Sequence, residues 1–118
     1  MKRNNLLKVT NLAILDRNVK YSLATADLNP DVGYLVSLPK CRETAEYIDR
    51  DILANYVKRR AHKLYQEGTY LHIYEEGGVY VLDTCDLHEQ KRNAYFYAIA
   101  RGQWKFHDNA TNDEVTIP

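Results

Sequence analysis

The chain has 118 residues, the size of one ordinary domain, and its 16 basic residues balance 16 acidic ones. Without net charge it has no global field to attract duplex nucleic acid or an anionic membrane, so any anion site must be local. Lys8, Thr10 and Asn11 interrupt the apolar N-terminal segment, which excludes a signal-peptide core or a membrane span there. We therefore expect one domain, residues 1–118, in the cytoplasm.

The first part of the chain, residues 1–32, carries no clear pattern. The stretches LLKV and NLAIL each fit either a short strand or a helical turn. The segment then runs into a turn at Asn29, Pro30, Asp31 and Gly33. The structure of residues 1–32 is left open at this point, and a core of residues 33–118 follows.

A strand and a helix begin that core. The segment GYLVSLP, residues 33–39, alternates as a strand does, and Pro39 stops it, which is typical of a central or near-central strand. Asp49 is a good N-cap residue, and apolar side chains recur at helical spacing over residues 50–67 until Gly68 permits a left-handed stop. We expect this helix to cover one face of a sheet.

A hairpin follows. TYLHIY at 69–74 and VYVLD at 79–83 are joined by EEGG at 75–78. The two glycines permit the positive backbone angles that a tight hairpin turn requires. This is the best-supported supersecondary element of the sequence.

The second helix is predicted from a capping box. Asp86 can accept a hydrogen bond from the third helical amide, and Glu89 can reach back to the cap. The helix would run to Arg101 and end at Gly102.

The last main strand, QWKFHD at 103–108, is predicted to turn Trp104 and Phe106 toward the core, and EVTIP makes a brief final extension. The resulting order after residue 32 is β-α-β-β-α-β. This order predicts an α+β fold, a mostly antiparallel sheet with two helices on one face.

No catalytic or metal-binding signature is present. The histidines lack zinc-site spacing, the serines sit in no nucleophile elbow, and the glycines form no phosphate loop. We therefore expect no enzyme, no metal and no cofactor, and we assign no role to Cys41 and Cys85. His72, beside Tyr70 and Tyr74, is either a ligand-binding group or, as favoured for a lone strand histidine, a partly exposed side chain.

Groups suited to binding a nucleotide are better represented. Tyrosines on the hairpin can stack a base, Arg101 and Lys105 can neutralise a phosphate, and Gln103 can read the edge of a base. The alternative is structural: tyrosines pack under a helix or form a dimer interface, and Arg101 caps helix carbonyls. The residues alone favour this alternative.

A resemblance to a known protein family supports the nucleotide-binding interpretation. GYLVSLP, VYVLD and NAYFYAIARGQWKFHDNATNDEV, spread over residues 33–115, resemble a family of small phage-encoded proteins, the Thoeris anti-defence sponges. Its members bind cyclic ADP-ribose signalling isomers without cleaving them. The resemblance implies a non-enzymatic phage protein in the host cytoplasm that encloses a nucleotide between protomers of a homo-oligomer. It also implies that cyclic oligonucleotides could bind at separate sites.

The hypothesis assigns one role to each candidate ligand-binding residue. Tyr74 stacks on the base, Arg101 and Lys105 contact phosphate, and Gln103 and Asp83 contact base-edge or ribose hydroxyls. Arg101 and Gln103 match the family's pattern best. Trp104 departs from it, since an aliphatic residue is expected there, and residues 1–32 match nothing in the family.

Two other functions use the same residues or their neighbours. The first alternative is a phage protein that inhibits a host protein by direct binding through a tyrosine-rich face, because tyrosine and arginine are enriched at interface hot spots. The second is a weak nucleic-acid binder that uses the basic back of the first helix, Lys58 to Lys63. The zero net charge disfavours it, and a solvated helix surface is the ordinary reading of such residues.

Overall fold

The computed structural model describes residues 2–118. It contains three helices and seven strands in one sheet. In chain order these are α1 (Arg3–Asp16), β1 (Asn18–Tyr21), β2 (Tyr34–Ser37), β3 (Glu43–Ala45), α2 (Arg50–Leu64), β4 (Thr69–Glu76), β5 (Val79–His88), α3 (Lys91–Ala100), β6 (Lys105–Asp108) and β7 (Asp113–Thr116).

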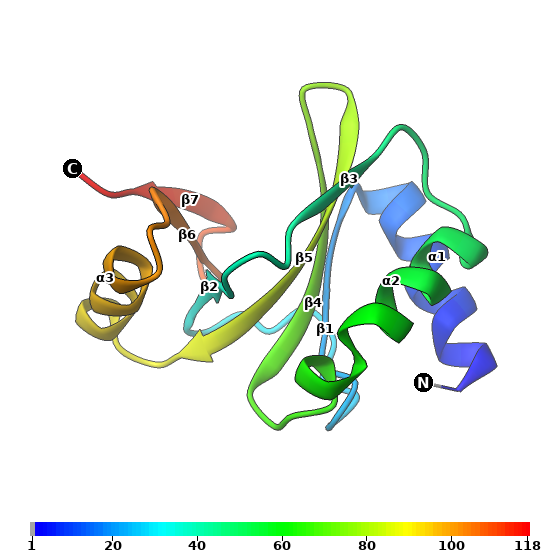
Figure 1. Cartoon of the computed structure of the whole chain (residues 1–118), viewed down its shortest axis with the longest axis horizontal. Coiled ribbons are helices and arrows are strands. Elements are labelled where there is room, and N and C mark those ends of the chain that lie inside the picture. The colour runs from blue at the N-terminus through cyan, green and yellow to red at the C-terminus, as the bar shows by residue number, and fades with distance from the viewer. Residues whose placement is uncertain (1) are drawn as a thin grey trace.

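The sheet is antiparallel throughout and has the order β1-β4-β5-β2-β6-β7, with β3 paired to the outer part of β5. The sheet curls strongly, so that side chains of its first strand, β1, reach the turn between its last two strands, β6 and β7. Lys20 Nζ donates to Oδ1 of Asn109 and of Asn112, each at 3.2 Å, and Asn18 Nδ2 donates to Asn112 Oδ1 at 3.3 Å. The long β4–β5 hairpin forms the spine of the molecule (Figure 1).

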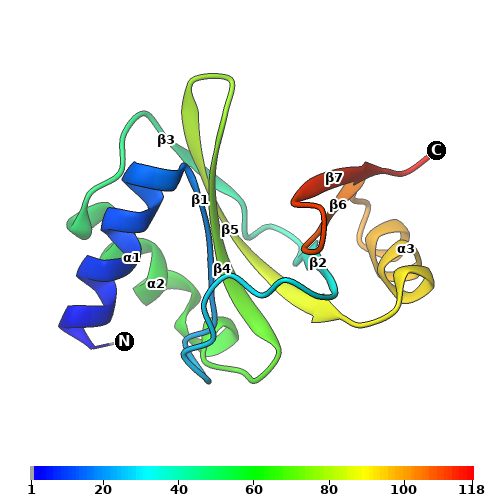
Figure 2. The ribbon, with the colours of Figure 1, turned by 180° about the vertical axis from the view of Figure 1, so that it is seen from behind.

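All three helices lie against the same, convex face of this curled sheet. Tyr56 of α2 hydrogen-bonds Thr84 of β5 at 2.8 Å, and Asp86, two residues further along that strand, shares its face. Val36 of β2 is the partner of Asp86 and packs in the cluster under α3. The helices α1 and α2 therefore cover one end of the face and α3 covers the other, as Figures 1 and 2 show from opposite sides.

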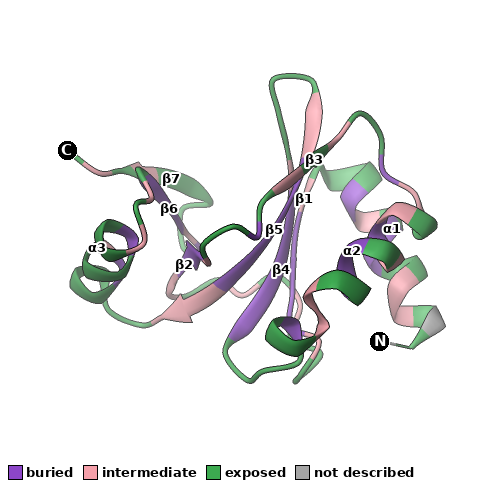
Figure 3. Cartoon of the chain, in the orientation of Figure 1, coloured by how far each residue is buried: buried purple, intermediate pink, exposed green. Residues whose placement is uncertain are grey.

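The main core lies between α1, α2 and strands β1, β4 and β5. Tyr56 and Leu53 of α2 and Leu71 of β4 are fully buried there. Figure 3 shows this concentration of buried residues on the central strands, and it shows that much of α3 is exposed. A second, smaller cluster joins Ala94 and Ala98 of α3 to Val36 and Phe106.

The other, concave face is unusually polar for a buried surface. Side chains of alternate residues on each strand share a face, and on this one most of them are polar. The buried polar or charged residues of the concave face are Lys20, Ser37, His72, Asp83, Lys105 and His107.

Several predicted elements are confirmed. β2 occupies the middle of the predicted first strand and is central in the sheet. Asp49 caps α2, with its side chain accepting from Ile52 N at 2.8 Å. The β4–β5 hairpin turns at Gly77 and Gly78, whose φ angles of 62° and 84° are the positive values that the turn requires.

Other predictions of the fold are corrected. The order β-α-β-β-α-β with two helices is wrong in its count, since residues 3–16 form a third helix and both β1 and β3 join the sheet. α2 ends at Leu64 rather than Glu67. His72 is 3% exposed, not a partly exposed strand histidine, because the curl of the sheet covers it.

The predicted capping box and the predicted orientation of Trp104 are also wrong. Asp86 belongs to β5, and Gln90 is the N-cap of α3, without a side-chain cap. Trp104 precedes β6 and is 56% exposed, whereas Phe106 is buried as predicted.

Candidate functional site

The concave face encloses a polar cavity, which the sequence alone does not predict. Its free space is about 10 Å³, roughly what one water molecule needs. The lining residues are Leu35, Ser37, Arg42, His72, Tyr74, Asp83, Cys85, Lys105, Phe106, His107 and Glu114. The cavity is therefore a filled polar interior, and a ligand larger than water must bind at its mouth.

Asp83 is the acidic centre of this cavity. Its carboxylate accepts hydrogen bonds from Ser37 Oγ and from Arg42 Nε, and Arg42 Nη2 also donates to Ser37 Oγ at 3.1 Å. Burial raises the pKa of Asp83, although the bonds from Ser37 and Arg42 oppose that rise. The Arg42 side chain is 34% exposed and carries positive charge from Asp83 out to the surface.

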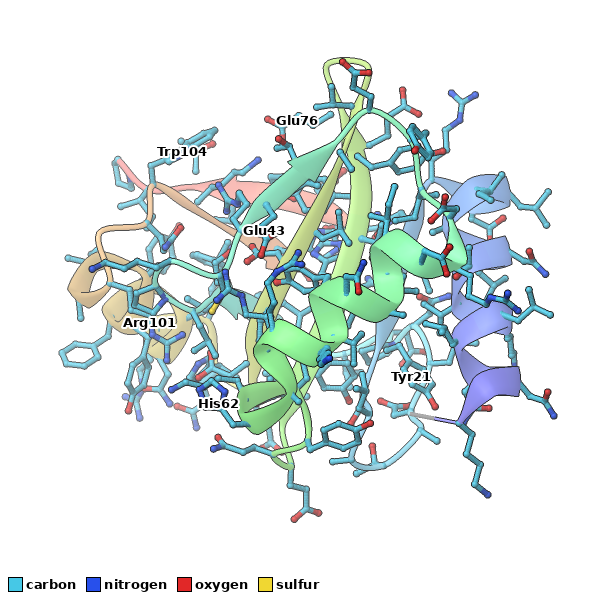
Figure 4. The ribbon with its side chains drawn as sticks, turned by 45° about the vertical axis from the view of Figure 1, so that its right-hand side comes forward. Tyr21, Glu43, His62, Glu76, Arg101 and Trp104 are labelled. Carbon is cyan, nitrogen blue, oxygen red and sulfur yellow. The ribbon has the colours of Figure 1, made fainter. Side chains whose placement is uncertain are left out.

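The second basic group of the cavity, Lys105, is nearly buried and lies against two aromatic rings. Lys105 Nζ lies 5.6 Å from the ring centroid of Tyr74 and 4.8 Å from that of Trp104. It also pairs with Glu76 Oε2 at 3.1 Å, and this glutamate is half exposed. Figure 4 labels Trp104 and Glu76 along the upper side of the molecule. The mouth thus combines two aromatic faces with two cations, each of which is paired with a carboxylate.

Two histidine rings occupy the floor of the cavity. The ring centroids of His72 and His107 are 4.9 Å apart, and His72 Nε2 lies 3.0 Å from Asn18 Oδ1. Burial lowers the pKa of His72 well below its ordinary value, and the nearby His107, Lys20 and Lys105 lower it further. His72 is therefore neutral and donates its Nε2 proton to Asn18.

The structure brings together three of the five predicted ligand-binding residues. Tyr74, Asp83 and Lys105 all line the cavity. Arg101 lies elsewhere, at the end of α3, where it pairs with Asp86 and sits 5.1 Å from the Tyr97 ring centroid. Figure 4 shows Arg101 below Trp104.

Gln103 also lies outside the cavity lining. It follows α3, and its backbone N–H donates to Ala98 O at 2.8 Å. Arg101 and Gln103 are thus parts of the α3 corner, while the other three candidates belong to the concave face.

The sequence does not predict two residues of the mouth, Arg42 and Trp104. Arg42 lies in what reads as a polar connection, and no local signal ties it to Asp83, 41 residues away. Alternation and the usual burial of tryptophan predict Trp104 in the core, but its side chain is 56% exposed. The curl of the sheet brings both to the mouth.

Cys85, the thiol that lines the cavity, is not an activated nucleophile. Burial raises its pKa well above its ordinary value and so keeps the thiol protonated. Among residues 2–118 no group of three His, Cys, Asp or Glu side chains is placed to hold a metal ion.

Fold and site together define a small α+β protein whose curled antiparallel sheet holds a polar cavity with an aromatic and basic mouth. No protein-family model matches the chain, and neither the curated proteins nor the solved structures include a match. Within the described part of the chain, no helix has the length and apolar character needed to cross a membrane.

Proposed function

We propose that this protein binds and sequesters a cyclic nucleotide signal without cleaving it, as a phage anti-defence protein in the host cytoplasm. The observation that carries the proposal is the position of Lys105, whose ammonium lies 5.6 Å from the Tyr74 ring centroid and 4.8 Å from the Trp104 ring centroid beside the polar cavity. Aromatic faces stack on bases, and lysine and arginine pair with phosphate. Cyclic ADP-ribose isomers, the ligands of the family that the sequence resembles, contain both groups.

Each residue of the mouth has one role in this proposal. Trp104 is the stacking surface for the base, since it is the most exposed of the aromatic rings there, and Tyr74 supports the cation beside it. Lys105 and Arg42 contact the pyrophosphate. Asp83 holds Arg42 in place through their hydrogen bond and ion pair.

The size of the cavity requires a second surface. Free space of about 10 Å³ cannot enclose a nucleotide, for which binding pockets of about 300–1,000 Å³ are usual. We propose that a second copy of the chain covers the mouth and completes the site. Light scattering of the protein with and without ligand tests this part, and a strict monomer in both states contradicts it.

Calorimetry tests the function itself. The purified protein is titrated with a cyclic ADP-ribose isomer, the complex is heated, and the released ligand is analysed by mass. Binding at micromolar or lower Kd, about 8 kcal/mol or more, with recovery of intact ligand is the expected result. Recovery of a hydrolysed product contradicts sequestration, and the absence of heat with any cyclic nucleotide contradicts the ligand class.

The outer surface of α3 favours a second candidate, inhibition of a host protein by direct binding. Phe96 is 65% and Ile99 61% exposed, and Tyr97 beside them is 41% exposed. Large exposed apolar side chains that cluster mark interaction surfaces. Loss of host-protein capture on Phe96→Ala, with nucleotide binding absent in the wild type, would favour this candidate.

A further inference from the structure

A second pocket lies at the seam where the curled sheet closes, away from the aromatic mouth. Its volume is about 220 Å³. The lining residues are Asn18, Lys20, Asn29, Pro30, Asp31, Asn109 and Asn112. They come from β1, from the loop that precedes β2, and from the turn between β6 and β7.

Lys20 is the charged group of this pocket, and it is 5% exposed. Its ammonium donates to Asn109 Oδ1 and Asn112 Oδ1, and it lies 3.2 Å from each of these oxygens and from His107 Nε2. Within the described residues the structure records no ion pair for Lys20, although buried charges are normally paired. The pocket therefore holds a positive charge without a carboxylate against it.

The hydrogen bonds of the pocket cannot all form at once. His107 Nε2 lies 3.2 Å from Lys20 Nζ and 3.0 Å from Asn112 Oδ1, and one tautomer either accepts from the ammonium or donates to the amide oxygen. When Nε2 carries the proton, Lys20 loses an acceptor, and Asn112 Oδ1 faces three donors, since Lys20 Nζ and Asn18 Nδ2 also approach it. An oxygen atom from a ligand would supply the missing acceptor.

The nearest acidic groups of the described chain do not form an ion pair with Lys20. Burial lowers the pKa of Lys20, and Glu114 and Asp108 oppose that shift only through space. Glu114 lies 3.3 Å from His107 Nδ1, on the far side of the imidazole. Asp31 lines the rim but is exposed. Positive charge at the base of the pocket excludes a metal cation and favours an anion.

We propose that this pocket binds a small oxyanion, a phosphate or a small carboxylate, through the ammonium of Lys20. The side-chain amides of Asn29 and Asn112 supply N–H donors for the remaining oxygens, since those of Asn18 and Asn109 already donate to Asn112 Oδ1 and to Val32 O. The volume lies below the range of about 300–1,000 Å³ usual for drug-sized ligands, which limits the occupant to a small molecule. The site is independent of the proposed nucleotide site, since neither Lys20 nor the asparagines line that cavity.

Titration by two-dimensional NMR tests the proposal on the wild-type protein. Sodium phosphate and sodium succinate are added in separate arms, with sodium chloride at matched ionic strength as the control. The expected result is a saturable shift of the Asn29, Asn109 and Asn112 amides in at least one oxyanion arm and none with chloride. The arm that saturates at lower concentration identifies phosphate or carboxylate as the ligand. No saturable shift up to about 10 mM, tenfold above a Kd of 1 mM, overturns the proposal.

Two variants localise the site. Lys20→Met removes the charge at similar length and is expected to weaken binding at least tenfold, whereas Lys58→Met, on the exposed side of α2, leaves it unchanged. Because Lys20 also ties the sheet edges together, Asn29→Gly provides a second test, since glycine accepts the φ of 49° at that position. This variant is expected to weaken binding severalfold. Wild-type affinity in a folded Lys20→Met protein overturns the proposal.

Discussion

Arg101 and Asp86 form a two-point ion pair that fixes α3 to β5. Nη1 lies 2.7 Å from Oδ1 and Nη2 lies 2.7 Å from Oδ2, and Arg101 Nη1 also reaches the carbonyl oxygen of Val36 at 3.4 Å. Burial alone would raise the pKa of Asp86, but the bonds from Arg101 and His88 outweigh it and hold that pKa below its usual value. The pair is therefore formed at neutral pH.

We expect Arg101→Ala to lower the free energy of unfolding by about 1.5–3 kcal/mol, the range for hydrogen bonds to charged groups, because it leaves a partly buried carboxylate without its partner. Denaturant unfolding of Arg101→Ala, Asp86→Ala and the double variant measures the coupling between them. A double variant no less stable than either single one supports the pair. A fully stable Arg101→Ala protein with lost nucleotide affinity would return Arg101 to the ligand site.

His72 makes stability depend on pH. Its pKa in the folded state is lowered well below 6.5, whereas the unfolded chain titrates near 6.5. Below pH 6.5 the unfolded state therefore binds more protons, and stability falls as the pH falls toward the folded-state pKa. Above pH 6.5 both states are neutral at this residue, and its contribution is constant.

The expected loss is up to about 1.4 kcal/mol per pH unit below 6.5. Unfolding curves at pH 7.5 and 5.5 measure it, and His72→Gln, which is neutral at both values, is expected to have a smaller difference. His62, on the exposed surface of α2, supplies the matched control His62→Gln. Equal slopes in the wild type and His72→Gln would show that another group causes the loss.

Tyr56 connects α2 to the sheet through its hydroxyl. The hydroxyl donates to Cys41 O at 2.7 Å and lies 2.8 Å from Thr84 Oγ1, in a fully buried position. Removing it leaves both partners unsatisfied, which costs about 1–3 kcal/mol. We therefore expect Tyr56→Phe to lower stability by this amount, while Tyr47→Phe, at an exposed tyrosine, changes it little. Unfolding in urea compares the two variants.

Local signals predicted the elements that depend on nearby residues. The Asp49 cap and the Gly77–Gly78 turn each need a few neighbouring residues, and both were found. The sequence does not predict α1, because apolar residues are distributed around the whole helix. Val9 and Ala13 are buried while Leu7 and Leu15 are exposed, so the sequence shows no single apolar face. Asp86 matched a capping pattern, but its partner Arg101 lies 15 residues away.

The candidate site depends on the curl of the sheet, which the alternation of apolar and polar residues does not predict. Alternation at 103–108 correctly places Phe106 on the convex face, in the cluster under α3, and Lys105 and His107 on the concave face. Alternation does not predict that the concave face is buried, because its burial results from the curl of the sheet. Three of the five candidate residues meet there because they share that face, and Arg42 joins them from a connection without regular pattern.

The comparison of Trp104→Ala with Phe96→Ala in a titration with a cyclic ADP-ribose isomer tests the central claim most directly. Both rings are exposed, but only Trp104 lies beside the Lys105 ammonium. Loss of a stacking ring costs about 1–3 kcal/mol, so the account predicts about tenfold or greater loss of affinity for Trp104→Ala and none for Phe96→Ala. Unchanged affinity in Trp104→Ala, or loss in Phe96→Ala alone, would contradict it.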